Sequence, residues 1–404
     1  MIAKYGLPAE VKFCVRCVMS NQRPSSAVEF QHTIGSKKQT IAFDDEGVCA
    51  ACRYAERKAQ IDWEQRERQL RALCNEFRSR NGSYDCVVPG SGGKDSVFAS
   101  HILKTKYGMR PLTVTWAPHL YTDVGFRNFQ NWLHVGGFDN YLFTPDGETH
   151  RLLTRLAFRN LLHPFQPFIL GQKNYPPRMA HLLGIPLVFY GEPEAEYGND
   201  DPDSPERARR YYSSDHGELY LGGVPVSEIN CDKRALAPYL PVDVDGLRVC
   251  YLGYYLKWTP QACYYYAAEH VGFEANDERT EGTYSKYNSI DDKTDPFHYW
   301  TTLIKFGIGR ATYDASQEIR SGHITREEGV ALVRKYDQEF PVRYFREFLD
   351  YIGMDKAEFH ETAERFKSPH LWDGGRLRHA VYAASGTHYM PPPTTNCGAA
   401  SVTV

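Results

Sequence analysis

The sequence predicts an α/β protein in which a parallel sheet is flanked by helices, with a small cysteine-rich module before the sheet and a mostly helical region after it. Short apolar runs alternate with helical patterns between about residues 86 and 190, an order typical of parallel βαβ units. Two closely spaced cysteine pairs precede this alternation, which fades beyond residue 198. We therefore divide the chain into a cysteine module at 1–60, an α/β domain at 61–255, a mostly helical region at 256–390 and a disordered tail at 391–404.

The composition narrows the class of protein. Hydrophobic residues make up 42% of the 404 residues and charged residues 24%, as in globular proteins. No apolar run approaches the ~20 residues that a membrane span requires, and the N-terminus lacks the pattern of a signal peptide, so we expect a cytoplasmic protein. The net charge of −3 argues against a protein whose main task is to bind nucleic acid.

The cysteine module contains two Cys-x-x-Cys pairs, Cys14 with Cys17 and Cys49 with Cys52. In a reducing compartment, four thiolates at this spacing favour a zinc site over disulfides. Because four thiolates complete the tetrahedral ligand set, we expect this zinc to be structural; a redox pair is the alternative. A short strand is predicted at 41–43, just before the second pair.

Capping residues mark the starts of several predicted helices. Asp62, with Gln65 three residues later, predicts a helix that reaches about Arg80. Two more capping boxes are expected in the C-terminal region: Thr325 with Glu328, and Asp355 with Glu358. The segment 199–214 is rich in charge, Pro and Ser, and we expect it to be a mobile loop.

Four strands are predicted, at 86–89, 111–116, 141–143 and 186–190. The carboxyl ends of parallel strands share one edge of the sheet, where ligands bind near the point at which the strand order reverses. The segments that follow three of these strands, 91–96, 115–119 and 191–197, should therefore border one cleft.

The segment Ser91 to Ser96 reads Ser-Gly-Gly-Lys-Asp-Ser and joins the first predicted strand to a helix. Gly92 and Gly93 permit a positive φ and a close approach of ligand oxygens, while the backbone N–H groups and the helix dipole favour an anion. The spacing is not that of a Walker motif, which argues against a kinase or GTPase. The segment resembles the PP-loop of ATP pyrophosphatases, which cleave ATP between the α- and β-phosphates; a glycine-rich turn without a ligand is the alternative.

Further motifs resemble the N-acetyl sugar amidotransferases of bacterial surface-polysaccharide biosynthesis. Besides the cysteine pairs and the glycine loop, these motifs are Phe43-Asp44, Gly191-Glu192 through Glu196-Tyr197-Gly198, Glu281-Gly282-Thr283-Tyr284, Asp291-Asp292, the run 305–312, Ile319-Arg320-Ser321-Gly322 and 325–328. The resemblance covers roughly residues 12–350, and its most specific part is the run 305–320. Pro89-Gly90 before Ser91 departs from the usual pattern of the family.

The resemblance implies a PP-loop ATP-binding domain with a zinc-knuckle module and a helical substrate region. The implied reaction converts an acetamido group of a nucleotide-linked sugar or nonulosonic acid into an acetamidino group, for O-antigen or other lipopolysaccharide. AMP is transferred to the amide oxygen, ammonia attacks the resulting imidate, and AMP leaves. No protein nucleophile is required, so the enzyme positions its substrates and stabilises phosphate charge.

The resemblance and the residue chemistry together assign candidate sites. Ser91, Gly92, Gly93, Lys94, Asp95 and Ser96 would hold the ATP phosphates with Mg²⁺, and Thr115 and Trp116 would lie near the adenine, with core packing as the alternative for Trp116. The candidate catalytic residues are Asp95, Glu192, Lys305 and Arg310, and the candidate substrate contacts are Glu196, Tyr284 and Arg320. The cations would meet the α-phosphate or an anionic sugar nucleotide, with one of them expected in a structural ion pair instead. Asp291 and Asp292 are weaker candidates, typical of a helix cap or turn.

Two other functions are compatible with part of the pattern. A tRNA 2-thiolation enzyme can also combine zinc knuckles with a PP-loop, but Cys231, Cys250 and Cys263 form no Cys-x-x-Cys pair after the loop. A nucleotide-binding scaffold without turnover would not need the complete loop at 91–96.

The source of nitrogen is expected to be a partner protein. Cys86 lies in the strand before the loop, and the later cysteines lie in no nucleophile context, so the sequence predicts no glutaminase site. Because free ammonia is scarce near neutral pH, we expect a separate glutamine amidotransferase to supply it.

Overall fold

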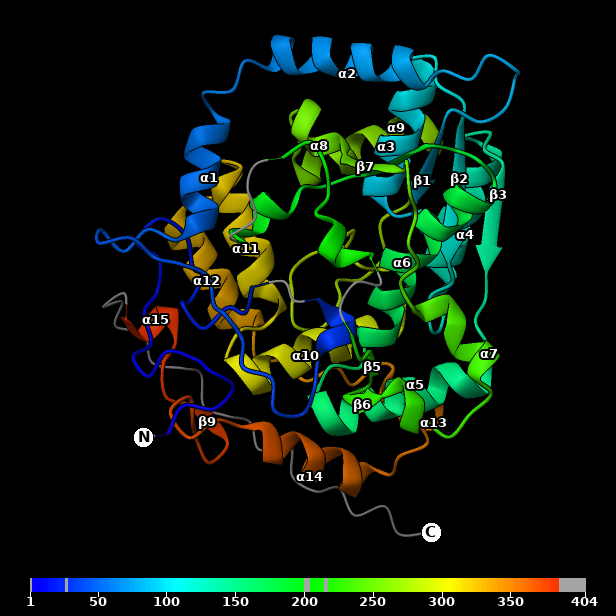
Figure 1. The fold of residues 1–404 in the computed structure, drawn as a ribbon. Helices are drawn as coiled ribbons and strands as arrows, with labels where there is room; N and C mark the ends of the chain where they lie inside the picture. The colour runs from blue at the N-terminus through cyan, green and yellow to red at the C-terminus, as the bar shows by residue number, and fades with distance from the viewer. Residues whose placement is uncertain (1, 26–27, 200–203, 214–216, 385–404) are drawn as a thin grey trace.

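The computed structural model describes residues 2–25, 28–199, 204–213 and 217–384. Five parallel strands form one sheet in the order β3-β2-β1-β4-β7 (Figure 1). Their bounds are β1 Cys86–Pro89, β2 Pro111–Trp116, β3 Asn140–Phe143, β4 Leu187–Tyr190 and β7 Arg248–Tyr251. This confirms the α/β class and the four predicted strands, while β7 was not predicted. The strand order reverses between β1 and β4, so a ligand site is expected at the carboxyl edge there.

Helices cover both faces of the sheet because successive residues of each strand point to opposite sides. Val88 and Phe189 pack with residues of α2 and α3 on one face, whereas Val87 and Val188 pack with residues of α6 on the other. The helices that connect and cover the strands are α2 Trp63–Phe77, α3 Lys94–Thr105, α4 Asp123–His134, α5 Gly147–Leu161 and α6 Gln166–Leu182.

The predicted cap of α2 is confirmed, but the helix ends before the predicted Arg80. The Asp62 carboxylate accepts a hydrogen bond from the N–H of Gln65 at 2.9 Å. The helix ends at Phe77. Two residues later the N–H of Ser79 donates to the Asp85 carboxylate at 2.6 Å. Asp85 therefore turns the chain toward β1 and ends the helix early.

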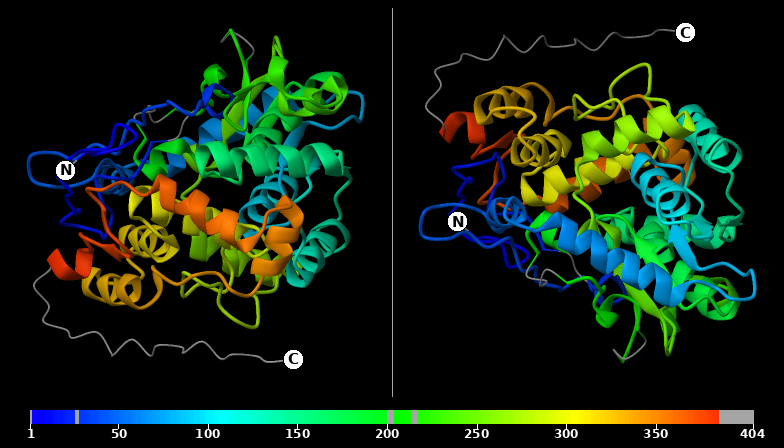
Figure 2. Two further views of the ribbon diagram at one scale, coloured as in Figure 1. Left: turned by 90° about the horizontal axis from the view of Figure 1, so that it is seen from below. Right: turned by 90° about the horizontal axis from the view of Figure 1, so that it is seen from above.

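The cysteine module contains little regular structure. Its helical segments are η1 Glu29–Gln31 and α1 Ala50–Lys58. The short strand predicted at 41–43 was wrong: residues around it form only isolated bridges, Pro24 with Thr40 and Phe43 with Cys49. In the views of Figures 1 and 2, the module (dark blue) lies against the C-terminal helices (yellow to orange).

The C-terminal region is helical, as predicted from about residue 260. Its helices are α9 Pro260–Val271, α10 Asp295–Phe306, α11 Arg310–Arg320, α12 Arg326–Tyr336, α13 Phe345–Ile352, α14 Lys356–Phe366 and α15 Val381–Ala384. The capping box of Thr325 and Glu328 is confirmed, and Asp355 caps α14 by accepting from the N–H of Glu358.

An aromatic cluster joins this region to the α/β domain. Phe297 of α10 stacks on Phe348 of α13 with ring centroids 4.3 Å apart. Phe158 of α5 stacks on Phe359 of α14 at 4.9 Å. All four rings are fully buried, so the helices of the two regions share one hydrophobic core.

The remaining elements are short. They are η2 Glu194–Tyr197, η3 Arg209–Tyr211, β5 Tyr220–Leu221, β6 Val224–Pro225, η4 Val226–Glu228, α7 Lys233–Leu236, η5 Ala237–Tyr239, α8 Leu252–Tyr255, β8 Trp372–Asp373 and β9 Arg376–Leu377. None of the helices in the described ranges combines the length and the hydrophobicity that crossing a bilayer would need.

Part of the predicted mobile loop at 199–214 packs along β7 instead. The N–H of Arg207 donates to the Val249 carbonyl at 2.7 Å, and the N–H of Tyr251 donates to the Pro205 carbonyl at 2.9 Å. Tyr211 and Tyr212 are buried. The prediction was therefore wrong for 204–213, because β7 offers a free edge that this segment partly pairs. Residues 200–203 and 214, and the tail predicted at 391–404, lie outside the described residues.

Candidate functional site

A cavity of about 540 Å³ lies at the carboxyl edge of the sheet, between β1 and β4. The wall of this loop cavity includes the segment 89–96, Gly191 and Glu192 after β4, and Asp291 and Asp295 from the C-terminal region. A second cavity of about 170 Å³, the arginine cavity, shares Lys94, Asp95, Glu192 and Tyr197 with it and extends to Arg23, Arg310 and Arg320. The predicted cleft between 91–96 and 191–197 is therefore present, but 115–119 does not line it.

The backbone of the glycine loop suits an anion. Gly92 has a φ of +87°, and a Cβ atom there would lie 2.6 Å from the Cα of Phe129, so the position requires glycine. Gly93 precedes the first turn of α3, and no described side chain caps that turn. The Ser96 hydroxyl donates to the Gly93 carbonyl at 2.9 Å. The first N–H groups of α3 thus stay available to a ligand oxygen.

Lys94 and Asp95 place opposite charges at the start of α3. Lys94 Nζ lies 2.6 Å from Asp95 Oδ2, and Lys94 is buried. Burial alone would lower the pKa of Lys94, but the Asp95 carboxylate outweighs it and raises that pKa, so the amine stays charged. Asp95 Oδ1 has no hydrogen-bond partner among the described residues. The pair can therefore offer a cation to phosphate and a free oxygen to a metal ion.

Glu192 is a carboxylate of the cavity wall whose pKa lies near neutral pH. It accepts hydrogen bonds from the Tyr197 hydroxyl and from Gln317 Nε2, the latter at 2.7 Å. Burial, reinforced by Asp95 and Glu196, raises the pKa of Glu192 to about 7. At neutral pH this side chain can therefore either hold or accept a proton.

Glu196 lies apart from the loop cavity. Its carboxylate forms a buried ion pair with Lys58 of α1. It lines a smaller cavity together with Lys58 and Arg320. Glu196 therefore links α1 to η2, and its contact with the substrate stays a prediction.

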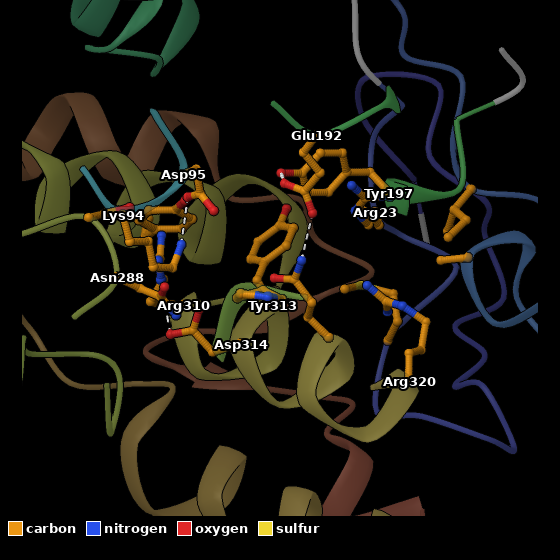
Figure 3. A pocket seen from close by; sticks show the side chains of 17 residues that line it. Arg23, Lys94, Asp95, Glu192, Tyr197, Asn288, Arg310, Tyr313, Asp314 and Arg320 are labelled. Carbon is orange, nitrogen blue, oxygen red and sulfur yellow. Dashed lines mark hydrogen bonds and ion pairs between the residues drawn. The ribbon is translucent and has the colours of Figure 1, made fainter. Parts of the chain in front are cut away.

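One face of α11 forms the floor of the arginine cavity (Figure 3). The residues of α11 in the cavity wall are Arg310, Tyr313, Asp314, Gln317 and Arg320. Arg310 Nε lies 3.1 Å from Asp314 Oδ2, and its guanidinium lies 4.0 Å from the centre of the Tyr299 ring. Burial opposes the charge of Arg310, but Asp314 and Tyr299 outweigh it and raise the pKa of Arg310. Arg310 is therefore a fixed cation, held on one side by Asp314.

Asp291 and Asp295 enter the loop cavity just before and at the start of α10. Burial raises the pKa of Asp291 despite a hydrogen bond with Ser91, and burial raises the pKa of Asp295 well above its usual range. Asp292 instead points away from the cavity and accepts from the His119 N–H at 2.7 Å and from the Thr294 N–H at 2.9 Å. The sequence indicated Asp291 only as a weak candidate for the site, because an Asp-Asp pair before a helix is also typical of a helix cap.

Besides Glu196, four residues predicted to bind the adenine or the substrate or to act in catalysis lie outside both cavities. Trp116 is 2% exposed, and its ring lies 4.9 Å from that of Tyr239. The buried Thr115 hydroxyl accepts from the Asn140 side chain. Both are core residues of β2, which corrects their assignment to the adenine. The Tyr284 hydroxyl donates to Glu318 at 2.9 Å, which corrects its assignment to the substrate.

Lys305 is the fourth of these residues. Its Nζ donates to the Leu161 carbonyl at 2.7 Å, and it lines a third cavity. This placement separates Lys305 from Arg310, which lines the arginine cavity. The sequence also missed Arg23, Tyr299 and Gln317, which line the arginine cavity. Arg23 and Tyr299 come from segments with no motif of their own, and Gln317 lies between the motif residues Thr312 and Ile319.

The four predicted cysteines lie together. Their Sγ atoms are all within 4.8 Å of one another, and all four side chains are buried. The N–H of Cys49 and the N–H of Met19 point at the sulfurs of Cys14 and Cys17, at 3.3 and 3.4 Å. Four buried sulfurs at these separations with N–H donors fit a structural zinc ion.

The cysteine module also forms part of the site. Met19, Arg23, Ile41 and Ala51, which lie within or between the two cysteine pairs, line the arginine cavity. Arg326 of α12 donates to the carbonyls of Cys17 and Cys14 at 3.2 and 3.3 Å. The contacts of Arg326 thus hold one wall of the cavity against the C-terminal helices.

Comparison with known proteins supports a role in glycan biosynthesis. Residues 281–383 match the family model described as LPS biosynthesis protein WbpG-like, C-terminal domain. This segment includes α10 and α11, which contribute Asp295, Tyr299 and Arg310 to the cavities. An uncharacterized protein of Methanocaldococcus jannaschii is 31% identical over 83 residues, which are 20% of this chain and 29% of that protein. The chain thus matches less than a third of the length of this relative.

Replacement of a cysteine ligand should remove the metal and destabilise the fold. We expect the wild-type protein to contain about one zinc per chain, and Cys49→Ser to lose it together with several kcal/mol of stability. Elemental analysis and thermal unfolding measure both effects. Cys263→Ser changes a buried cysteine outside the cluster and should keep the zinc. A full zinc content in Cys49→Ser would contradict the assignment.

Removal of the Glu192 carboxylate should stabilise the protein above neutral pH. Folded Glu192 titrates at about 7 because burial disfavours its charge, whereas an unfolded glutamate titrates near ~4.3. Between these pH values the folded chain holds a proton that the unfolded chain has released, so stability falls as the pH rises toward 7. Glu192→Gln abolishes this titration, and we expect it to gain on the order of 2 kcal/mol over wild type between about pH 5 and pH 8.

Urea denaturation of wild type and of Glu192→Gln, at about pH 5 and at about pH 8, measures this difference in the free energy of unfolding. Glu64→Gln removes a carboxylate that is 92% exposed, and should show no such gain. An equal stability difference for Glu192→Gln at both pH values would show that Glu192 titrates normally in the folded protein.

Proposed function

We propose that this protein is an ATP-dependent amidotransferase that converts an acetamido group of a sugar into an acetamidino group for lipopolysaccharide or a related surface glycan. One observation carries the proposal: α11, from the segment that matches the LPS biosynthesis family, lines the arginine cavity together with Lys94 and Asp95 of the glycine loop. An anion-binding loop thus meets a region associated with glycan biosynthesis. The motifs of both regions resemble those of the N-acetyl sugar amidotransferases.

The residues present fit ATP with Mg²⁺. The N–H groups at the start of α3 and the charged Lys94 would hold the β- and γ-phosphates. Asp95, with its unpartnered oxygen, and Asp291 would hold Mg²⁺, a cation that prefers oxygen ligands and neutralises phosphate charge. Arg310 would meet the α-phosphate, because Asp314 and the Tyr299 ring hold its guanidinium as a charged group in the cavity wall.

The chemistry then has two steps. The amide oxygen of the sugar attacks the α-phosphorus of ATP, the bond to the β-phosphate oxygen breaks, and pyrophosphate leaves. Ammonia next attacks the imidate carbon, one proton is lost, and the C–O bond to AMP breaks. Glu192 suits the role of proton acceptor because its pKa of about 7 matches neutral pH. Arg310 would stabilise the AMP leaving group.

The alternative of tRNA thiolation gains no support from the cavity walls. Such a reaction needs a cysteine that can carry sulfur to the adenylated base. Among the described residues, no cysteine lines the loop cavity or the arginine cavity. Cys263 is buried, and burial raises the pKa of its thiol well above the usual value.

Turnover should release AMP and pyrophosphate. We expect Asp95→Ala and Ser91→Ala to lower the rate by about a hundredfold or more while leaving the fold intact, because each removes a predicted contact to phosphate or Mg²⁺. The assay combines α-labelled ATP, ammonium and a UDP-linked diacetamido uronic acid, with chromatography of the nucleotides. Mass spectrometry of the sugar should show a decrease of about one mass unit as NH replaces O.

The exposed Ser83→Ala serves as the control for these variants. Formation of ADP and phosphate as primary products would overturn the proposed reaction. AMP release that depends on bulk tRNA and not on the sugar would point to the thiolation alternative.

The isolated chain should use ammonia but not glutamine. We expect activity with concentrated ammonium salts to rise with pH toward the pKa of ammonium, because only the neutral molecule is a nucleophile. Glutamine alone should give no product, since a separate glutamine amidotransferase is proposed to supply ammonia. Efficient glutamine-dependent turnover by the purified chain would show that this protein carries its own glutaminase.

A further inference from the structure

A third cavity of about 210 Å³ lies next to the loop cavity. It is bounded by residues of the cysteine module, the connection between α5 and α6, α10 and the end of α14. Ile169 and His298 line both this cavity and the loop cavity, so the two are neighbours across these side chains. We call the third one the lysine cavity, after Lys38 and Lys305 in its wall.

The wall of the lysine cavity is rich in basic groups. Besides the two lysines it contains His32, His163 and His298, and among its described residues Glu29 is the one carboxylate. That carboxylate is already engaged: Glu29 Oε2 lies 3.0 Å from His32 Nδ1 and 3.3 Å from His163 Nε2. The wall of the cavity therefore has more basic than acidic groups.

Lys305 is the cation with the least compensation. It is 9% exposed, and its Nζ contacts the Leu161 carbonyl and the faces of the Tyr5 and Phe306 rings, at 4.8 and 5.4 Å. Burial and the nearby Lys38 lower the pKa of Lys305 to about 7. A buried ammonium without a carboxylate partner is costly, and a ligand that brings negative charge would remove that cost.

Two buried polar atoms in the wall are also unsatisfied. Ser25 Oγ and His298 Nδ1 have no hydrogen-bond partner among the described residues. Buried polar atoms are usually paired, so atoms of this kind facing a cavity indicate a polar ligand. The ligand would combine negative charge with oxygen atoms that accept hydrogen bonds.

We infer that the lysine cavity binds an anionic oxygen group of the acceptor molecule, either a carboxylate or a diphosphate, with Lys305 as its main contact. That the ligand is the acceptor rests on the proposed function; the anion site itself does not. Arg310 remains free for the α-phosphate of ATP, because it lies in the arginine cavity. A sugar held by its anionic group in the lysine cavity would reach past Ile169 and His298 toward the activated phosphate.

Calorimetric titration of the full-length protein tests this site with probes that separate the two sources of charge. UDP and UDP-N-acetylglucosamine carry a diphosphate without a carboxylate, whereas glucuronate and N-acetylneuraminate carry a carboxylate without a diphosphate. We expect one of these two groups of probes to bind, and Lys305→Gln to weaken that binding about tenfold or more. Affinity for ATP should stay within about twofold.

Lys104→Gln is the matched control. Lys104 is also a helical lysine that donates to backbone carbonyls, those of Gly136 and Gly137, but it lines none of the three cavities. The Lys104→Gln variant should bind the anion with the same affinity as the wild-type protein. Ser25→Asp is a second variant, which places a carboxylate in the cavity and should weaken the anion in the same way without removing the lysine.

The outcomes separate the two proposals. Binding of neither group of probes, or binding that Lys305→Gln and Ser25→Asp leave unchanged, would overturn the anion site. Equal losses of anion and ATP affinity in Lys305→Gln would also overturn it, since they would show a general defect. Lys305-dependent binding of an anion with no AMP release from any acetamido sugar would leave the site in place and refute the proposed reaction instead.

Discussion

The candidate site depends on how closely α4 approaches two other segments of the backbone. A Cβ atom at Gly92 would lie 2.6 Å from the Cα of Phe129 in α4, and a Cβ atom at Gly125 of α4 would lie 2.4 Å from the Cα of Asp291. The Thr122 hydroxyl at the start of α4 also donates to the Ile290 carbonyl. The helix thus holds the glycine loop from one side and the Asp291 segment from the other. Without glycine at these two contacts, the wall from the sheet and the wall from the C-terminal region could not meet.

Bringing these walls together buries several charges in one place, and the structure compensates them only in part. Lys94 is paired with Asp95, and Arg310 with Asp314. Glu192, Asp291 and Asp295 form no such ion pair with another described residue, and burial raises the pKa of each. Binding of a metal ion, or of a proton from a ligand, stabilises unpaired buried carboxylates the most. The paired cations are stabilised when phosphate replaces the water beside them. Buried charges that are only partly compensated are therefore what a site for charged substrates requires. In the protein without a ligand, the same charges lower the stability of the fold.

The sequence predicted those parts of the fold that local chemistry decides. The bounds of β2 and the cap at Asp62 follow from apolar patterning and from a side chain that bonds three residues ahead. β7 was missed because its four residues form a strand only by pairing with β4, which lies about sixty residues earlier. Lys305 and Arg310 are five residues apart, yet they reach different cavities because α10 ends at Phe306 and α11 begins at Arg310, after Gly307 takes a left-handed conformation. The spacing of residues along the chain does not reveal that one helix ends and another begins between them. It also does not reveal that Trp116 is buried.

The cysteine cluster has a more direct part in the site than its distance in sequence from the loop implies. The backbone between the two cysteine pairs carries Arg23 and Ile41 into the arginine cavity, and few regular elements hold that backbone. Arg326 fixes the first pair to α12, whereas the second pair begins α1, whose Lys58 reaches Glu196 beside the segment after β4. An ion bound by the four sulfurs would connect these two attachments through a rigid centre. The position of Arg23 relative to Glu192 and Arg310 would then be set by the metal.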